Sequence, residues 1–390
     1  MDRCPVCASG ALVPLFQAER VPVFCNVQWP DRAQARQASQ ARLEIVACND
    51  CGHACNAAFD PNRVAYSPAY DNSQHFSATF RDYATRLADR LVDTYDIRQK
   101  SVVDIGCGRG DLLALLAERG KNRGFGFDPS ADPATAGASR ADVTLSQDYF
   151  DREHAAEIGP SLVCCRHVLE HVFDPMQFLD KLRQSIAGAG MPLLYLEVPS
   201  GEHLLRSAGL WDYIYEHYSY FSRRSLEIVL RAAGFETLRI FEDFGGQFLC
   251  AEARPSTVSG MMPSGGVQGV DSVDIGAAAD RMRAKLAGWR DWADVLGASD
   301  RTATIWGAGS KGVMFLNLLG LAAPDPIDFA VDQNPNKSGR FLAVSGQVVM
   351  PPSHLVQRPV GEIIVMNDIY LAEIRAHLVG LGSRARIATA

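Results

Sequence analysis

Two adjacent residues, Glu216 and His217, are the strongest candidates for proton-transfer chemistry in this chain. They lie within WDYIYEHYSYFS (residues 211–222), where several aromatic side chains surround them. Histidine has an unperturbed pKa of ~6.5, so it can take a proton near neutral pH. A Glu-His pair in a loop that follows a strand suits a dry core poorly. The pattern therefore favours a catalytic base over the alternative, an aromatic core loop.

A glycine-rich turn indicates a bound nucleoside. The stretch VVDIGCGRG (102–110) ends a strand and opens a helix, and glycines there let the backbone turn sharply and approach a ligand. Asp104 precedes the turn, and Asp128 follows GFGF about 20 residues later, where a carboxylate can accept hydrogen bonds from ribose hydroxyls. The spacing differs from the dinucleotide pattern G-x-G-x-x-G. The alternative is a Rossmann-like turn without a ligand.

The segment RHVLEHVFDP (166–175) follows the fourth strand of this region. His167 is expected at the carboxyl edge of the sheet, where sites of α/β proteins lie. His171 comes one helical turn later, and a structural role is favoured for it. Spacing alone would also allow a zinc site from His167 and His171, but it offers no third ligand.

Two C-x-x-C pairs predict a structural zinc site. Cys4 and Cys7 are separated by 40 residues from Cys48 and Cys51. Two such turns can converge on a tetrahedral Zn²⁺ ion, and a short irregular segment needs the metal to fold. A redox pair is the alternative, although no thioredoxin-like pattern surrounds either pair. His53 and Cys55 are weaker candidates for substitute ligands.

A second glycine-rich turn, TIWGAGSKG (304–312), fits G-x-G-x-x-G, and Asp332 ends the next strand. Read alone, it is a dinucleotide site. The remaining chain is only half of a Rossmann unit, which weakens that reading. Lys311 at the start of the following helix offers a second possibility, a phosphate or other anion.

Strands and helices alternate from residue 101 onward, which predicts a doubly wound, mostly parallel sheet with crossover helices. A prior of ~150 residues per domain suggests two or three domains for 390 residues. We expect a zinc-binding module (1–60), a cofactor-binding α/β domain (61–255), a Gly/Ser-rich linker followed by a helix (256–299) and a Rossmann-like domain (300–390).

Composition excludes several classes of function. A net charge of −7 argues against nucleic-acid binding. No apolar run reaches the roughly 18–20 residues of a membrane helix, and the start of the chain shows no signal-peptide pattern. We therefore expect a cytoplasmic protein that binds neither nucleic acid nor membrane.

The order of these motifs resembles the deoxysugar C-methyltransferases. That family has paired zinc-binding cysteines, a class I methyltransferase domain that binds S-adenosylmethionine, and a Rossmann-like C-terminal domain. Its Tyr-His-Glu-His-x-x-Tyr motif aligns through Glu-His with Glu216 and His217 and places its last Tyr at Tyr220. The chain departs from the family at Ile214-Tyr215 and at Gly245-Gly246-Gln247, which marks a sister subgroup.

The resemblance implies methylation of carbon next to a ketone of a nucleotide-linked sugar. His217 would be the base, Glu216 would orient it, and Tyr215 or ordered water would stabilise an enolate. Tyr220, at the position of the family's trailing Tyr, would be a further catalytic residue. Contacts to S-adenosylmethionine are expected from ten residues: Asp104, Gly106, Gly108, Gly110, Asp128, Pro129, Asp148, His167, Tyr70 and Gln74. Tyr66, Asn72 and Ser73 would help to cap the site.

Three other functions stay open at this point. The first is an O-methyltransferase on a sugar or natural-product hydroxyl, because His217 could serve either acceptor. The second is a nicotinamide-dependent oxidoreductase using the second glycine turn, and the third is a zinc-bearing scaffold without activity. We expect a monomer, since three domains can enclose a cleft within one chain.

Overall fold

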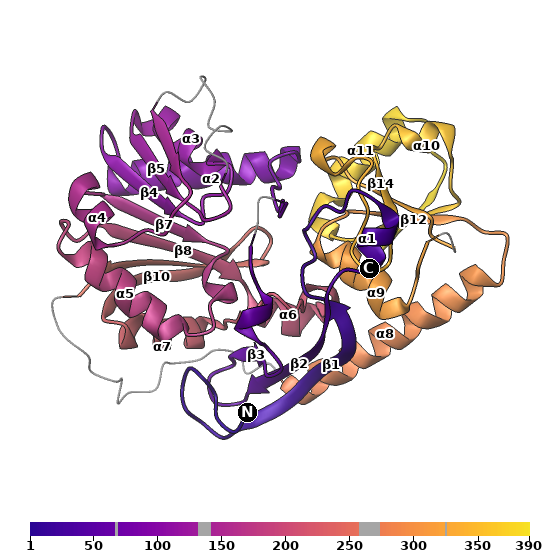
Figure 1. The fold of residues 1–390 in the computed structure, drawn as a ribbon, viewed down its shortest axis with the longest axis horizontal. Helices are drawn as coiled ribbons and strands as arrows, with labels where there is room; N and C mark the ends of the chain where they lie inside the picture. The colour runs from indigo at the N-terminus through magenta and orange to yellow at the C-terminus, as the bar shows by residue number, and fades with distance from the viewer. Residues whose placement is uncertain (67–68, 132–141, 257–273, 324–325) are drawn as a thin grey trace.

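The computed structural model describes residues 1–66, 69–131, 142–256, 274–323 and 326–390. Most of the expected linker, 257–273, lies outside the described residues. Two α/β domains lie at opposite ends of the molecule, and the N-terminal strands lie between them and below (Figure 1).

The first α/β domain is built on a seven-stranded sheet of order β10-β11-β8-β7-β4-β5-β6. Strand β11 pairs antiparallel with both neighbours, and β4, β5, β6, β7 and β8 are parallel. The central strands are almost fully buried, as strands covered on both faces must be. The strands are β4 (Ser101–Ile105), β5 (Arg123–Phe127), β6 (Val143–Ser146), β7 (Leu162–Arg166), β8 (Leu193–Pro199), β10 (Phe235–Asp243) and β11 (Phe248–Pro255).

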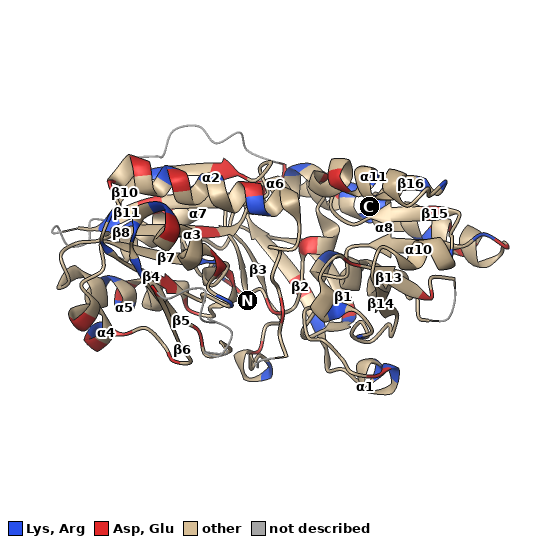
Figure 2. Ribbon diagram, turned by 90° about the horizontal axis from the view of Figure 1, so that it is seen from above, with Lys and Arg blue, Asp and Glu red and all other residues tan. Residues whose placement is uncertain are grey.

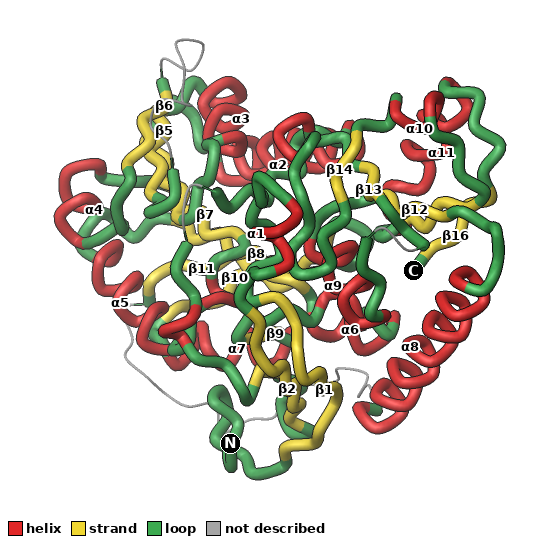
Figure 3. The backbone as a smooth tube through the Cα atoms, turned by 45° about the vertical axis from the view of Figure 1, so that its right-hand side comes forward, coloured by secondary structure: helices red, strands yellow, loops and turns green. Residues whose placement is uncertain are grey.

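Helices cover both faces of this sheet, as the tube view shows (Figure 3). Their starts follow ordinary capping chemistry: the side chains of Ser77, Asp174 and Ser222 each accept a backbone N–H in the first turn. The helices are α2 (Ala78–Tyr95), α3 (Asp111–Gly120), α4 (Arg152–Ile158), α5 (Pro175–Ala187), α6 (Gly201–Ser207) and α7 (Arg223–Ala232), with short 3₁₀ turns η3 (Leu169–His171) and η4 (Leu210–Asp212). The doubly wound sheet expected from the alternating pattern is therefore observed.

The N-terminal region does not pack as a separate module. Strands β1 (Leu12–Pro22), β2 (Gln40–Cys48) and β3 (Ala54–Asn56) form an antiparallel sheet whose fourth strand is β9 (Ser219–Tyr220). This pairing ties the segment after His217 to the N-terminal strands. Helix α1 (Arg32–Arg36), between the two cysteine pairs, instead reaches the C-terminal domain, where Val344 N–H donates to the Ala35 carbonyl.

The C-terminal domain is a five-stranded parallel sheet of order β14-β13-β12-β15-β16. Its strands are β12 (Ala303–Trp306), β13 (Phe329–Val331), β14 (Val348–Met350), β15 (Glu362–Val365) and β16 (Arg386–Thr389). Its helices are α9 (Ser310–Leu319), α10 (His354–Gln357) and α11 (Leu371–Gly380). The long helix α8 (Ile275–Gly297) runs along its outer side and contacts β1 (Figure 1).

Direct hydrogen bonds hold the two α/β domains together. The Glu373 carboxylate on α11 accepts from the backbone N–H groups of Ala78 and Thr79 and from both hydroxyls, Ser77 and Thr79, at the start of α2. An anion at a helix N-terminus meets unpaired N–H groups and the positive end of the dipole. These bonds hold the pKa of Glu373 at about 2 despite the opposing effect of burial.

Acidic and basic segments are interspersed along the elements in Figure 2. Within the described part of the chain, no helix has the length and apolar character needed to cross a bilayer.

Candidate active site

A cavity of about 240 Å³ lies between the two α/β domains. Its walls come from the end of β7, from η3, from the loop before β9, from the segment before α2, and from the second glycine turn. Of the residues predicted from sequence, His217, His167, Tyr70 and Gln74 line it, together with Asn72 and Ser73. The structure thus brings the proposed base and part of the expected cofactor set together.

The first glycine turn joins β4 to α3 at the carboxyl edge of the large sheet. Gly106 has φ +70°, and a Cβ there would lie 2.3 Å from Val168 Cγ2, so only glycine fits. Asp104 is buried, its Oδ1 has no hydrogen-bond partner, and burial raises its pKa to about 7. An unpaired buried carboxylate is costly, so this site fits a ligand that brings a positive group or a donor.

The residues expected around the nucleoside gather beside this turn. The Asp128 carboxylate accepts from Gly108 N–H at 2.9 Å and from both the N–H and hydroxyl of Ser130 at 2.7 Å. Gln147 donates to the Pro129 carbonyl at 3.2 Å, which brings the loop before exposed Asp148 next to the end of β5. None of these residues, nor Asp104 or the turn glycines, is among the cavity-lining residues named above.

His167 is held rigidly at the end of β7. Its backbone has φ +53°, a rare conformation for a residue with a side chain, and its Nδ1 lies 3.2 Å from Glu170 Oε1. Its Nε2 lies 3.1 Å from Glu197 Oε1 on β8. Burial lowers the pKa of His167, but these two carboxylates outweigh it and raise the pKa to about 9.

Glu197 on β8 fixes the position of His167. Its fully buried carboxylate accepts from Arg166 at 2.7 and 3.0 Å and from the Tyr83 and Tyr195 hydroxyls. Burial opposes ionisation, yet the Arg166 charge and these hydrogen bonds hold the pKa of Glu197 well below its usual value. Glu197, near the end of β8, therefore positions His167.

His217 and His171 form a pair at the floor of the cavity. Their ring centroids lie 4.6 Å apart at an interplanar angle of 80°, and both residues line the cavity. His171 Nδ1 lies 3.0 Å from the Glu216 carbonyl oxygen and 2.6 Å from the Tyr66 hydroxyl. Burial and the neighbouring histidines hold the pKa of His217 well below its usual value, so its ring is neutral and has a free lone pair.

The Glu216 side chain faces away from His217. It is fully buried, its Oε1 accepts from Cys25 N–H at 3.5 Å, and its Oε2 has no hydrogen-bond partner. Burial raises the pKa of Glu216 to about 8. Among the described residues, the hydrogen bond that joins it to the histidine pair comes from His171, which donates to the Glu216 backbone carbonyl.

The two tyrosines expected to be catalytic, Tyr215 and Tyr220, do not line the cavity. The Tyr215 hydroxyl accepts from Asp60 N–H at 3.0 Å and faces the N-terminal strands. The Tyr220 hydroxyl accepts from Ile214 N–H at 2.9 Å and holds the loop closed. Both hydroxyls thus have protein partners, so they support the loop.

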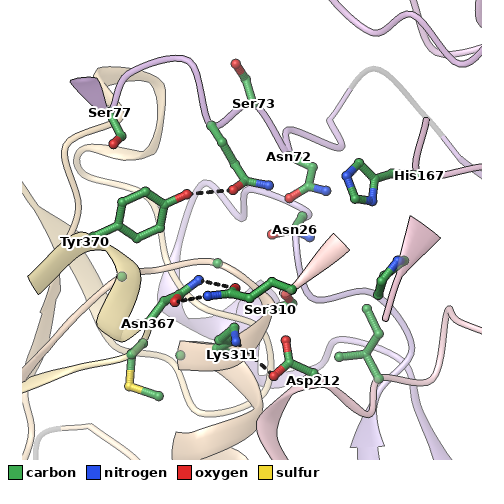
Figure 4. A pocket seen from close by; sticks show the side chains of 18 of the residues that line it. Asn26, Asn72, Ser73, Ser77, His167, Asp212, Ser310, Lys311, Asn367 and Tyr370 are labelled. Carbon is green, nitrogen blue, oxygen red and sulfur yellow. Dashed lines mark hydrogen bonds and ion pairs between the residues drawn. The ribbon is translucent and has the colours of Figure 1, made fainter. Parts of the chain in front are cut away.

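The second glycine turn forms the opposite wall. Gly307, Gly309, Ser310 and Lys311 line the cavity, and Lys311 Nζ lies 2.9 Å from Asp212 Oδ2 (Figure 4). Asp332 accepts from Ala308 N–H at 2.8 Å, as Asp128 does from Gly108 in the first turn. Gln247 and Asn367 exchange two 2.9 Å hydrogen bonds across the domain boundary.

The four paired cysteines converge at one point. Cys4 Sγ lies 3.6 Å from Cys51 Sγ, Cys7 Sγ lies 3.6 Å from Cys48 Sγ, and all four sulfurs lie within 4.8 Å of one another. Zn–S bonds of ~2.3 Å in a tetrahedron place sulfurs roughly 3.8 Å apart, so the cluster fits zinc. His53 is buried against Phe221 and does not join the cluster, nor does Cys55.

Two protein-family models match the chain. A methyltransferase domain matches residues 74–240, and a C-methyltransferase C-terminal domain matches residues 276–383. Both models describe methyltransferases. The first match surrounds the first glycine turn and the second surrounds the second turn, which supports an S-adenosylmethionine-dependent methyltransferase.

One relative matches almost the whole chain. The C-methyltransferase NovU of Streptomyces niveus is 25% identical over 379 residues, covering 90% of this chain and 86% of that protein. A ubiquinone biosynthesis O-methyltransferase of Psychrobacter arcticus is 31% identical over 103 residues, covering 24% of this chain and 40% of that protein. The second match thus covers only about a quarter of the chain.

Among solved structures, the chain is similar to a Burkholderia thailandensis 1,6-didemethyltoxoflavin-N1-methyltransferase with bound S-adenosylhomocysteine. The TM-score is 0.35 and the identity 16%, covering 53% of this chain and 97% of that one.

Several cavity residues carried no sequence signal. Asn26 lies between the cysteine pairs, and Asn367 follows β15 without a recognisable motif, whereas Asp212 stands in the marked segment 211–222 without having been singled out there. Glu170 stands in a motif that the sequence did mark, yet its contact with His167 becomes visible only when the chain is folded.

Proposed function

We propose that the protein is an S-adenosylmethionine-dependent C-methyltransferase that alkylates the carbon next to a ketone of a nucleotide-linked sugar. The observation that carries the proposal is the placement of neutral His217 in a cavity between the methyltransferase domain and the C-methyltransferase C-terminal domain. NovU, a C-methyltransferase similar over almost the whole chain, supports methylation at carbon.

The first glycine turn would hold the cofactor, whose sulfonium supplies an electrophilic methyl group. Gly106 accommodates the Val168 side chain, Asp104 offers an unpaired carboxylate, and Asp128 orders the turn through Gly108. His167, fixed by Glu170 and Glu197, lines the cavity at the end of β7. These residues orient and desolvate the reacting groups, which is the main contribution a protein makes to alkyl transfer.

His217 would take the proton from the carbon next to the ketone. The C–H electron pair would then form the enolate, whose carbon would take the methyl group as the C–S bond breaks, and the electron pair of that bond would stay on the sulfur of a neutral thioether. His171, held by the Glu216 carbonyl, keeps the His217 ring edge-on. The Tyr215 and Tyr220 hydroxyls are engaged with backbone groups. Cavity side chains such as Asn26 or Asn72 would therefore donate the hydrogen bond to the enolate oxygen.

The cavity's second wall suits the nucleotide part of the substrate. The N-terminus of α9 and Lys311 face the space, and unpaired helix N–H groups with a lysine attract phosphate. The Cys4, Cys7, Cys48 and Cys51 cluster would hold a structural Zn²⁺ ion that fixes the start of the chain. We further propose that the protein acts as a cytoplasmic monomer.

An acceptor panel tests the proposal. Purified protein is given methyl-labelled S-adenosylmethionine with nucleotide-linked 4-keto sugars and, as matched controls, their 4-alcohol counterparts. We expect the labelled methyl group to appear only in the products of the 4-keto sugars. Transfer to the alcohols but not the ketones would mean O-methylation, the alternative that the ubiquinone biosynthesis relative favours.

A further inference from the structure

The floor of the cavity holds three potential metal ligands that no step of the proposed reaction requires together. Glu170, His171 and His217 each place one ligand atom within 4.8 Å of the other two. They come from η3 and from the loop before β9, which are fixed to each other by Tyr218 N–H donating to the Glu170 carbonyl. The grouping therefore belongs to the folded framework.

Two atoms of this group lack partners. Glu170 is 1% exposed, and its Oε2 has no hydrogen-bond partner, because Oε1 alone faces His167. His217 Nδ1 is likewise buried and unpaired. Buried polar atoms without partners are rare and indicate an unseen ligand or ion.

The residues around this group already provide the outer hydrogen bonds that orient the ligands of a metal site. His171 Nδ1 is engaged by the Glu216 carbonyl, which leaves Nε2 to coordinate, and Glu170 Oε1 is engaged by His167. Such outer contacts fix the orientation of ligating histidines and carboxylates. Two imidazoles with one carboxylate, and space in the cavity for a further ligand, are typical of zinc and neighbouring transition-metal ions rather than Mg²⁺ or Ca²⁺.

We propose that Glu170, His171 and His217 form a binding site for a divalent transition-metal cation, and that the cation competes with the proton for His217. Ligands at about 2.1 Å from one ion lie roughly 3.4 Å apart in a tetrahedron, so the side chains need to close by about 1 Å. A neutral imidazole has one nitrogen with a free lone pair. His217 can therefore accept the substrate proton or hold a cation, so occupancy inhibits methyl transfer. This inhibition rests on the proposed function, whereas the binding does not.

Co²⁺ added to zinc-loaded protein tests the binding directly. We expect one bound equivalent per chain, with the weak visible bands of nitrogen and oxygen ligation and no thiolate charge-transfer band, which separates this site from the cysteine cluster. Glu170→Gln and His171→Asn should each weaken Co²⁺ binding by at least about tenfold. His203→Asn, which changes another cavity histidine outside the group, should leave Co²⁺ affinity unchanged.

The inhibition is tested with the acceptor panel. Co²⁺ should lower the methyl-transfer rate reversibly. In Glu170→Gln, the Co²⁺ concentration that halves the rate should rise by the same factor as the dissociation constant for Co²⁺. Absence of a bound equivalent beyond the cysteine cluster, or equal affinity in Glu170→Gln, would overturn the site. A chelator-treated enzyme that is inactive until Co²⁺ returns would overturn the inhibitory role. Cation binding without carbon methylation would instead count against the proposed function alone.

Discussion

The rings of His171 and His217 lie 4.6 Å apart, nearly perpendicular, although 45 residues separate them along the chain. One follows β7 in the large sheet, and the other precedes β9 in the N-terminal sheet. Their meeting point joins the large-sheet domain to the loop that carries the proposed base. The site therefore depends on the pairing of β3 with β9 as well as on the large sheet.

Replacement of the proposed base should lower turnover without changing cofactor binding. His217→Asn is expected to lower kcat by ~10²–10⁴, the usual contribution of a general base, with S-adenosylmethionine affinity unchanged. The matched control is His354→Asn on α10, a histidine packed on Phe329 far from the cavity lining. Steady-state kinetics and calorimetric cofactor titration check both. Equal turnover in His217→Asn and the wild type would remove His217 from the mechanism.

The buried carboxylate before the first glycine turn should make stability depend on pH. Burial raises the pKa of Asp104 from 3.8 to about 7, so the native state holds this proton more tightly than the unfolded chain does. Stability from this group is therefore greatest at low pH, falls as pH rises from about 4 to 7, and is then constant.

Asp104→Asn should consequently stabilise the cofactor-free protein at pH 8 by up to about 4 kcal/mol, with the gain vanishing towards pH 4. The same variant should bind S-adenosylmethionine more weakly. Denaturant unfolding at several pH values measures the first effect and calorimetry the second. A stability difference independent of pH would show that Asp104 does not titrate as described.

The close approach at the first glycine turn predicts a specific steric cost. Gly106→Ala places a Cβ 2.3 Å from Val168 Cγ2 and should destabilise the protein by about 2–4 kcal/mol while weakening cofactor binding. Gly159→Ala is the control, because Gly159 has φ +58° but no atom near its added Cβ, so only about 1 kcal/mol should be lost. Equal destabilisation of the two variants, seen in denaturant midpoints, would exclude the clash.

The lysine on the second wall should act on substrate binding alone. Lys311→Ala is expected to raise the KM for the nucleotide-linked ketone by about tenfold, as expected for one lost phosphate contact, with kcat little changed. Its ion pair with Asp212 is partly exposed and contributes at most ~1 kcal/mol to stability, so the variant should unfold almost normally. An unchanged KM would place the nucleotide elsewhere.

The cysteine cluster predicts one zinc ion per chain. Cys7→Ser should lose the zinc measured by elemental analysis and lower the melting temperature, because a short irregular segment depends on the metal. Cys55→Ser is the matched control, since Cys55 is buried nearby but outside the cluster. Zinc retained in Cys7→Ser, or lost equally in Cys55→Ser, would contradict this ligand set.

Much of the fold followed from local sequence signals. The sequence correctly predicted the buried strands around Val103 and Cys164 and the capped helices. Their signals, which are apolar runs, glycine turns and capping residues, are short-range features. The sequence also marked His167 and His217, which do share the cavity. The N-terminal region was different: it was expected as a module of its own, yet β3 pairs with β9, a contact between residues more than 160 positions apart.

The directions in which the side chains point could not be predicted from the sequence. Adjacent residues such as Glu216 and His217 point to different places, the first towards Cys25 and the second into the cavity. Tyr215 and Tyr220 likewise turn to backbone partners, which depends on the path of the whole loop. The grouping of Glu170 with His171 and His217 depends on that path too.

The fate of the hydrogen next to the ketone tests carbon methylation most directly. A nucleotide-linked 4-keto sugar carrying deuterium at that carbon is converted with ¹³C-methyl S-adenosylmethionine, and the product is examined by mass spectrometry and NMR. We predict loss of one deuterium and a ¹³C-methyl signal in the aliphatic rather than the methoxy region, whose protons correlate with the carbon that carried the deuterium. His217→Asn should form none of this product. Full retention of deuterium with the methyl group on oxygen would contradict the enolate reaction and the role of His217 in it.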